Sequence, residues 1–218
     1  MANIFSKLSA FDLDHTLLKE NSSFSFGKYL YRQKHISLSD FFFIIRSNII
    51  YNLGFLSISE LHQRAFERLF YGKSLFLVEF WVSSFLDKHL ESLFYNPAIK
   101  ALIDAQQAGH ITAIISSSPS FLVEPIAKRL NLTFCQATEY AVDKDHKFCQ
   151  IASLMLGEDK ARFIMEFMKE HKISKKQVIA YSDSILDLPF LLTAGEAIAV
   201  NPDRKLRLFC LKHNWPII

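Results

Sequence analysis

The pattern of apolar and polar positions divides the chain into two regions of different character. In KLSAFDLD, residues 7–14, a short apolar run ends in two acids, and we predict a buried strand there. From residue 22 to about residue 93 the apolar positions recur at helical spacing. Within SISELHQRAFERLFYG, the residues of one helical face are Leu61, Ala65, Phe66 and Leu69. The pattern therefore predicts one strand followed by an all-helical block.

After residue 97 the pattern changes to strands that alternate with helices. We predict strands in ITAIISSS, QVIAYSD and AIAV, each flanked by an amphipathic helix, and a hairpin that turns at residues 143–146. Such alternation is typical of a parallel sheet covered by helices. We therefore predict an α/β fold with two domains. The core domain comprises residues 1–21 and 94–218, and the helical domain of residues 22–93 is inserted after the first strand.

Composition narrows the class of protein. Half of the 218 residues are apolar and 21 are Phe, which is enough for a sizeable core, while a net charge of +3 does not favour a nucleic-acid partner. The three cysteines lack metal-ligand spacing and are typical of a reducing compartment. The most apolar window, DFFFIIRSNIIYNLGF, has no pure apolar run longer than five residues, whereas a bilayer span needs about 20. We predict a cytoplasmic protein without a signal peptide or an integral membrane segment.

Polar side chains follow three of the predicted strands. They are Asp12 and Asp14 after the first, Ser116, Ser117 and Ser118 after the second, and Asp183 and Asp187 after QVIAYS. Each group alone also occurs as a turn or a helix cap. Ligands of an open parallel sheet, however, bind beyond the carboxyl ends of its strands, where all three groups would meet. Carboxylates suit Mg²⁺, and serine hydroxyls with Lys160 can hold phosphate oxygens, so we predict a site for phosphate and a divalent cation.

The same residues resemble four motifs of the haloacid dehalogenase superfamily. DLDHT resembles the first motif, AIISSS the second, the lysine of EDKARF the third, and YSDSILDLPFL the fourth, over a stretch from Asp12 to about Pro202. The helical insertion between the first two motifs is similar to the C1 cap of subfamily IB, the phosphoserine-phosphatase-like branch. The resemblance implies a Rossmann-like core with a parallel sheet, a helical cap, and Mg²⁺ as cofactor.

Carried over residue by residue, the resemblance also implies roles for the motif residues. Asp12 is implied as the nucleophile that forms an aspartyl-phosphate, and Asp14 as the acid that protonates the leaving alcohol and later activates water. Ser116 and Lys160 are implied to hold the phosphoryl group. The implied metal set is Asp12, Asp14 through its backbone carbonyl, and Asp183. Thr16 and Asp187 support the site, Asp187 by way of either the metal waters or the lysine.

One departure from the phosphoserine phosphatases concerns specificity. Those enzymes carry a cap glutamate nine residues after the nucleophile, where this chain has Asn21, with Glu20 beside it. We predict that Glu20 and Asn21 influence substrate choice and that phosphoserine is not the best substrate. The aromatic residues nearby favour an apolar or quaternary-ammonium leaving group; they are Phe24, Phe26, Tyr29 and Tyr31.

The sequence thus predicts a Mg²⁺-dependent phosphatase that acts on a small organic phosphate monoester. Two alternatives stay open at this point. A phosphotransferase would use the same aspartyl-phosphate with an acceptor alcohol in place of water. A catalytically silent binding or regulatory module would keep the fold alone. The oligomeric state does not follow from the sequence.

Overall fold

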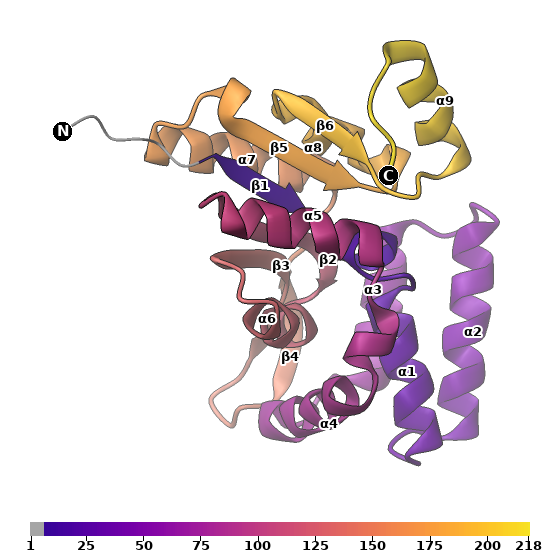
Figure 1. The fold of residues 1–218 in the computed structure, drawn as a ribbon. Coiled ribbons are helices and arrows are strands. Elements are labelled where there is room, and N and C mark those ends of the chain that lie inside the picture. The colour runs from indigo at the N-terminus through magenta and orange to yellow at the C-terminus, as the bar shows by residue number, and fades with distance from the viewer. Residues whose placement is uncertain (1–6) are drawn as a thin grey trace.

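A six-stranded sheet forms the centre of the structure, a computed structural model that describes residues 7–218 (Figure 1). Residues 1–6 of the predicted segment 1–21 lie outside the described residues. The strands are β1 (Leu8–Phe11), β2 (Ile111–Pro119), β3 (Phe134–Val142), β4 (Phe148–Ser153), β5 (Val178–Ser182) and β6 (Glu196–Ala199). Their order across the sheet is β4-β3-β2-β1-β5-β6, so β1 lies between β2 and β5.

The predicted parallel arrangement is correct for five of the six strands. Strands β3, β2, β1, β5 and β6 run parallel, with Leu8 opposite both Ile111 and Val178. Strand β4 runs antiparallel to β3 and makes the sheet mixed. The reason is the hairpin predicted at residues 143–146, because a connection this short can only return the chain alongside the strand it has just left. Five parallel strands bring their carboxyl ends to one edge of the sheet.

Successive side chains of each strand enter two different cores on the two faces of the sheet. In β1, Leu8 and Ala10 belong to one core and Phe11 to the other. Helices α7 (Gly157–His171), α8 (Leu188–Thr193) and α9 (Arg204–His213) supply the first core, while α5 (Asn96–Gln107) and α6 (Ser120–Arg129) supply the second. The central strands β1, β2 and β5 are therefore buried on both faces, which leaves the edge at their carboxyl ends as the place for polar residues.

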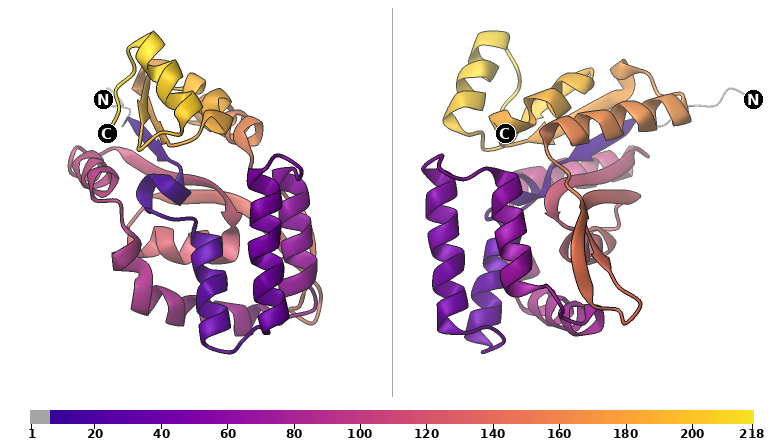
Figure 2. Two further views of the ribbon diagram at one scale, coloured as in Figure 1. Left: turned by 90° about the vertical axis from the view of Figure 1, so that its right-hand side faces the viewer. Right: turned by 180° about the vertical axis from the view of Figure 1, so that it is seen from behind.

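The region predicted to be helical forms four helices, α1 (Ser22–Arg32), α2 (Leu38–Asn52), α3 (Ile58–Leu69) and α4 (Leu75–Leu93). Helices α2 and α3 each begin at a serine whose side chain and backbone exchange hydrogen bonds with an acid three residues later, Ser37 with Asp40 and Ser57 with Glu60. Figures 1 and 2 show α1, α2 and α3 on the side of the sheet towards which β1 points.

Two sets of backbone contacts fasten these helices to the sheet. Where the chain leaves and re-enters the core, Lys19 N–H donates to Leu93 O at 2.7 Å and Tyr95 N–H donates to Leu17 O at 2.9 Å. Beyond α3, Gly72 N–H donates to Phe148 O at 2.8 Å, which joins the helices to the β3–β4 hairpin. The helical region is therefore held over the carboxyl edge of the sheet at two places: where its first and last residues meet, and at the connection between α3 and α4.

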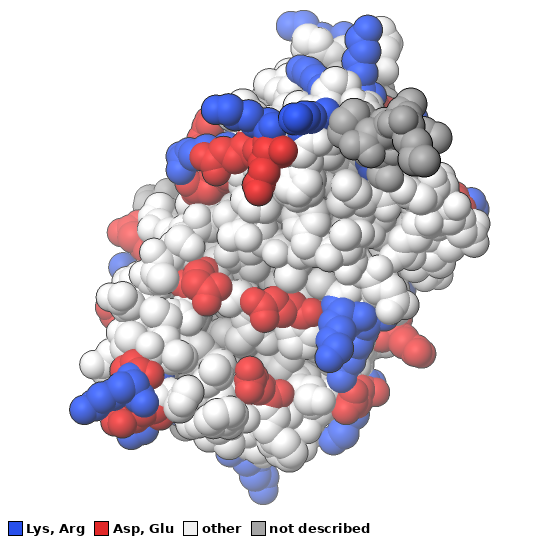
Figure 3. All heavy atoms as spheres, turned by 90° about the vertical axis from the view of Figure 1, so that its left-hand side faces the viewer, with Lys and Arg blue, Asp and Glu red and all other residues white. Residues whose placement is uncertain are grey.

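Three further observations concern the charged side chains, the helices and the cysteines of the described residues. Acidic and basic side chains are interspersed on the face drawn in Figure 3, outside its grey atoms. Within residues 7–218, no helix combines the length and the apolar character that a bilayer span requires. Cys210 is buried, whereas Cys135 and Cys149 are only partly buried, and all three are free thiols.

Candidate active site

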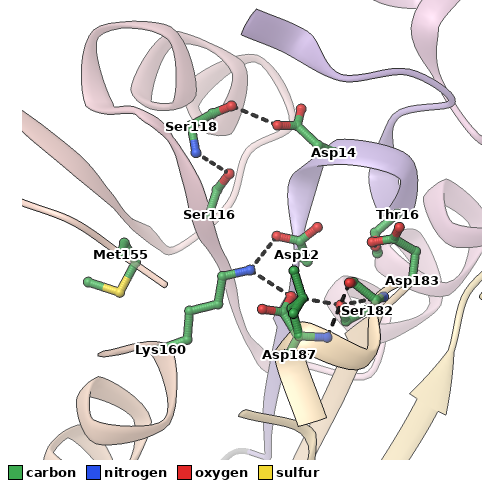
Figure 4. A network of polar contacts seen from close by, with 12 residues as sticks. Asp12, Asp14, Thr16, Ser116, Ser118, Met155, Lys160, Ser182, Asp183 and Asp187 are labelled. Carbon is green, nitrogen blue, oxygen red and sulfur yellow. Dashed lines mark hydrogen bonds and ion pairs between the residues drawn. The ribbon is translucent and has the colours of Figure 1, made fainter. Parts of the chain in front are cut away.

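The two acids that follow β1 point in different directions. A tight turn over Leu13–Leu17 follows Asp12, and within it His15 has a φ of 58°. Asp12, which precedes the turn, faces Lys160, whereas Asp14, which lies inside it, faces Ser118 (Figure 4). Both acids are buried, at 5% and 8% exposure. The turn therefore separates the two carboxylates of one short motif and gives each its own partners.

Lys160 is buried between two carboxylates. Its Nζ donates to Asp12 Oδ1 at 2.6 Å and to Asp187 Oδ2 at 2.7 Å, and Ser182 Oγ donates to Asp187 Oδ2 at 2.8 Å (Figure 4). The sequence predicted that Asp187 supports either the metal waters or the lysine. In the structure its carboxylate contacts Lys160. Gly157, at the start of α7, permits this approach, because a Cβ there would lie 2.1 Å from the Leu186 carbonyl oxygen.

The acids at this edge outnumber the positive charge that faces them. Burial raises the pKa of Asp12 to about 7 against the opposing effect of Lys160, and Asp187 adds to the rise. Burial, with the charges of Asp12 and Asp187, raises the pKa of Asp183 to about 8. Burial by itself would lower the pKa of Lys160, but the two carboxylates outweigh it and the pKa is raised. Three carboxyl groups thus share one ammonium, an imbalance that a divalent cation would relieve.

The donor set at this edge fits Mg²⁺. Asp12 and Asp183 supply carboxylate oxygens, and Thr16 Oγ1 donates to Asp183 Oδ1 at 3.3 Å. The side chain of Asp14 faces away, in keeping with the implied use of its backbone carbonyl. Residues 7–218 contain no group of three or more His, Cys, Asp and Glu side chains arranged to hold a metal by themselves. Mg²⁺ usually takes one or two carboxylates and completes its shell with water and phosphate oxygens, so two acids are sufficient.

Asp14 is held by the start of α1 and by β2. Its Oδ1 accepts from the Ser22 N–H at 2.7 Å, and its Oδ2 accepts from Ser118 Oγ at 2.7 Å and Asn21 Nδ2 at 3.2 Å. Within residues 7–218, Oδ1 has the Ser22 amide as its sole partner. One lone pair of Oδ1 therefore stays available for a proton.

The three serines near the end of β2 have different surroundings, which the motif comparison did not distinguish. Ser116, predicted to hold phosphate, is fully buried, and its Oγ accepts from the Ser118 N–H at 3.1 Å. Ser117 and Ser118 line the cavity described below, whereas Ser116 does not. Ser118, which the motif comparison did not single out, contacts Asp14 directly. The serine run signalled a polar strand end, but the choice among three identical residues depends on how β2 ends.

The two residues predicted to influence specificity have different surroundings. Glu20 does not line the cavity; its carboxylate accepts from Ser25 Oγ at 2.8 Å and from Lys28 Nζ at 2.7 Å. Glu20 therefore does not face the cavity, and its influence on substrate choice stays a prediction. Asn21 does line the cavity, but its Oδ1 accepts from the Phe24 N–H at 2.8 Å and so caps α1.

A cavity of about 450 Å³ opens over the acids and extends between α1, α2 and α3. This volume lies within the usual range for small-molecule sites. Phe24 and Phe26 line it as the sequence suggested. Tyr29 and Tyr31 do not, because Tyr29 is buried against Phe85 and Tyr31 stacks on Phe41. Rotation about the α1 axis decides which of these four aromatic residues face the cavity.

Comparison with known proteins shows the family to which the chain is related. The family model of haloacid dehalogenase-like hydrolases matches residues 10–192. The chain belongs to this family. The resemblance to this family that was stated from the four motifs is thereby confirmed.

Three similar proteins illustrate the relationship. A probable phosphatase of Mycobacterium tuberculosis is 29% identical over 213 residues, which cover 95% of this chain and 73% of the relative. A Bordetella pertussis protein of unknown function shares the fold with a TM-score of 0.88, 22% identity and 98% coverage of both chains. A substrate-bound phosphoserine phosphatase has a TM-score of 0.65 and 18% identity. The match covers 98% of this chain and 92% of that protein. The predicted Rossmann-like α/β fold is confirmed.

The buried ion pair predicts a large stability effect. We expect Lys160→Met to lower the free energy of unfolding by about 3–5 kcal/mol at pH 8, because it leaves Asp12 and Asp187 buried without their cation. Urea denaturation followed by circular dichroism measures the change. Lys100→Met is the matched control, since its pair with Asp104 is exposed and should contribute little. Equal losses in the two variants would contradict a stabilising role for the buried pair.

Proposed function

We propose that this protein is a Mg²⁺-dependent phosphoric monoester hydrolase that acts through a phosphorylated Asp12. The observation that carries the proposal is the environment of this carboxylate. Lys160 holds Asp12 Oδ1, while Asp12 Oδ2 accepts no hydrogen bond within residues 7–218, and the residue lines the cavity. A buried carboxylate with one oxygen fixed and one directed at open space suits a nucleophile. Family membership and the relative named as a probable phosphatase support the same reaction.

In the first step, Asp12 Oδ2 attacks the phosphorus atom of the bound monoester. A bond forms between Oδ2 and phosphorus, and the bond from phosphorus to the ester oxygen breaks. The leaving oxygen takes a proton from Asp14, whose Oδ1 has a lone pair available for that proton. Lys160 compensates negative charge on Asp12 and on the phosphoryl oxygens, which reduces the repulsion between two anions.

In the second step, water attacks the phosphorus atom of the phosphorylated Asp12. Asp14, now without its proton, accepts a proton from this water, and the bond between Asp12 Oδ2 and phosphorus breaks. Inorganic phosphate leaves and the carboxylate of Asp12 returns to its ion pair with Lys160. Ser22 and Ser118 hold Asp14 in place for both transfers through their hydrogen bonds to its two oxygens.

The proposed metal ligands are the side chains of Asp12 and Asp183 and the backbone carbonyl of Asp14. Bound there, Mg²⁺ would neutralise charge on the phosphoryl group. Thr16 positions Asp183, and Asp187 positions Lys160. Ser116 supports the loop by accepting the Ser118 N–H.

We also propose the division into two domains that the sequence predicts. Residues 22–93 would form a cap over a core of residues 1–21 and 94–218, because α1, α2 and α3 close the cavity above the acids. The substrate would be a small molecule, consistent with the cavity volume. The cytoplasmic location and the absence of a nucleic-acid partner stay predictions.

The proposal predicts that Asp12→Asn abolishes turnover. An amide cannot form the aspartyl-phosphate, and loss of such a group costs about three orders of magnitude or more in kcat. Phosphate release from p-nitrophenyl phosphate measures the effect. Asp104→Asn, a change of the same kind at an exposed acid, should keep full activity. Retention of a tenth of the wild-type rate by Asp12→Asn would exclude Asp12 as nucleophile, and inactivity of the wild type towards every ester would favour a silent module.

Dependence on metal gives a second prediction. EDTA should reduce turnover to background, and Mg²⁺ should restore it. Mg²⁺ should also raise the melting temperature of the wild type, since a ligand that binds the folded state stabilises it by about 2.7 kcal/mol at a hundred times its Kd. Asp183→Asn removes an anionic ligand and should lose most of this thermal shift. Full activity in EDTA would contradict the proposal.

The role of Asp14 as an acid predicts a dependence on the leaving group. Asp14→Asn should slow the hydrolysis of alkyl phosphates much more than that of p-nitrophenyl phosphate, because nitrophenolate departs with little need of a proton. The measurement is kcat for one ester of each kind in wild type and variant. An equal loss for both esters would instead make Asp14 a residue that holds the loop and α1 in place.

A further inference from the structure

The part of the cavity beyond the acids is mainly apolar. Helices α1, α2, α3 and α6 contribute aromatic and aliphatic side chains to it, among them Phe26, Leu30, Ile44, Leu61 and Phe121. A leaving group whose phosphate lies at Asp12 therefore extends into a chamber of hydrocarbon. Such a chamber favours a ligand that buries apolar surface.

The charges that line the cavity are all at its catalytic end. Within residues 7–218, Lys160 is the one lysine or arginine in the lining, and its ammonium already binds Asp12 and Asp187. The acids in the lining are Asp12, Asp14, Asp183 and Asp187, with no glutamate. A carboxylate or a second phosphate on the leaving group would thus enter the apolar chamber without a cation to pair with, which is costly.

The polar groups in the remainder of the chamber are neutral. They are Ser47, Asn48, Tyr51, His62 and the hydroxyl of Tyr140. His62 Nδ1 lies 3.4 Å from the Tyr140 hydroxyl oxygen. Burial lowers the pKa of His62 to about 4, so this imidazole is uncharged at neutral pH. These groups are able to bind a single hydroxyl or carbonyl group of a ligand, but they offer no partner to an ionised one.

We propose that the substrate is the phosphate monoester of an uncharged, largely apolar alcohol. This inference rests on the proposed function and adds the chemistry of the leaving group. Of the two leaving groups that the sequence left open, the lining favours the apolar one. Tyr29 and Tyr31, two of the four aromatic residues expected to contact a quaternary ammonium, do not line the cavity, and no described carboxylate lines it outside the catalytic end.

The test is a homologous series of n-alkyl phosphates, from ethyl to hexyl, compared with glycerol phosphate, phosphocholine and phosphoserine. The leaving alcohols of the alkyl series differ little in acidity, so length changes burial rather than chemistry. We expect kcat/KM to rise along the series by up to about fourfold for each methylene that becomes buried. Hexyl phosphate should exceed phosphoserine, phosphocholine and glycerol phosphate by at least tenfold.

A variant tests where the alkyl chain binds. Ala65 lines the cavity on α3, and Ala65→Leu should fill part of the chamber, so that hexyl phosphate loses at least tenfold more kcat/KM than ethyl phosphate. Arg64→Leu is the matched control, since Arg64 is exposed on the same helix and does not line the cavity; its profile along the series should equal that of the wild type.

The outcomes separate this inference from the proposed function. A flat or falling series with measurable turnover, or a lead for phosphoserine or phosphocholine, would overturn the inference and leave the phosphatase proposal intact. Absence of turnover for every ester, p-nitrophenyl phosphate included, would overturn both. If Ala65→Leu does not fold, the change in kcat/KM along the alkyl series of the wild type decides whether the leaving group is apolar, because that measurement needs no variant.

Discussion

The buried contact of Lys160 with Asp12 and Asp187 is the interaction on which the rest of the site depends. Parallel strands bring β1 and β5 side by side, so the acids that follow them meet at one edge of the sheet. Carboxylates this close and this buried repel one another unless a cation is among them. Helix α7, which precedes β5 in the chain, brings that cation to the edge. The close approach at Gly157 sets how far Lys160 reaches.

One lysine does not balance the negative charge of all of these acids. The raised pKa values of Asp12 and Asp183 show that burial and mutual repulsion work against their ionised forms. A protein that gained nothing from this arrangement would be more stable with neutral residues in these positions. Under the proposed function, the imbalance is stability given up in exchange for an affinity for Mg²⁺ and a reactive carboxylate.

The helices over the sheet contact Asp14 as well as closing the cavity. The first amide of α1, that of Ser22, donates to Asp14, so the position of this helix and the position of the acid are linked. The same helices supply the apolar walls of the cavity, and the contact of Gly72 with Phe148 fixes their far end to the β3–β4 hairpin. If Asp14 is the acid of the proposed reaction, protonation of the leaving group and selection of the substrate depend on the same helices.

The sequence by itself determined the α/β fold, the helical insertion and the grouping of Asp12, Lys160 and Asp183. These depend on local signals, namely apolar periodicity, capping serines and acids at strand ends, and such signals act within a few residues. The tertiary structure decided the choice of Ser118 as a partner of Asp14 and the turn of Glu20 away from the cavity towards Lys28. Each of these is a competition between partners far apart in the chain or on opposite sides of one helix, and only the packed arrangement of the elements sets which partner is within reach.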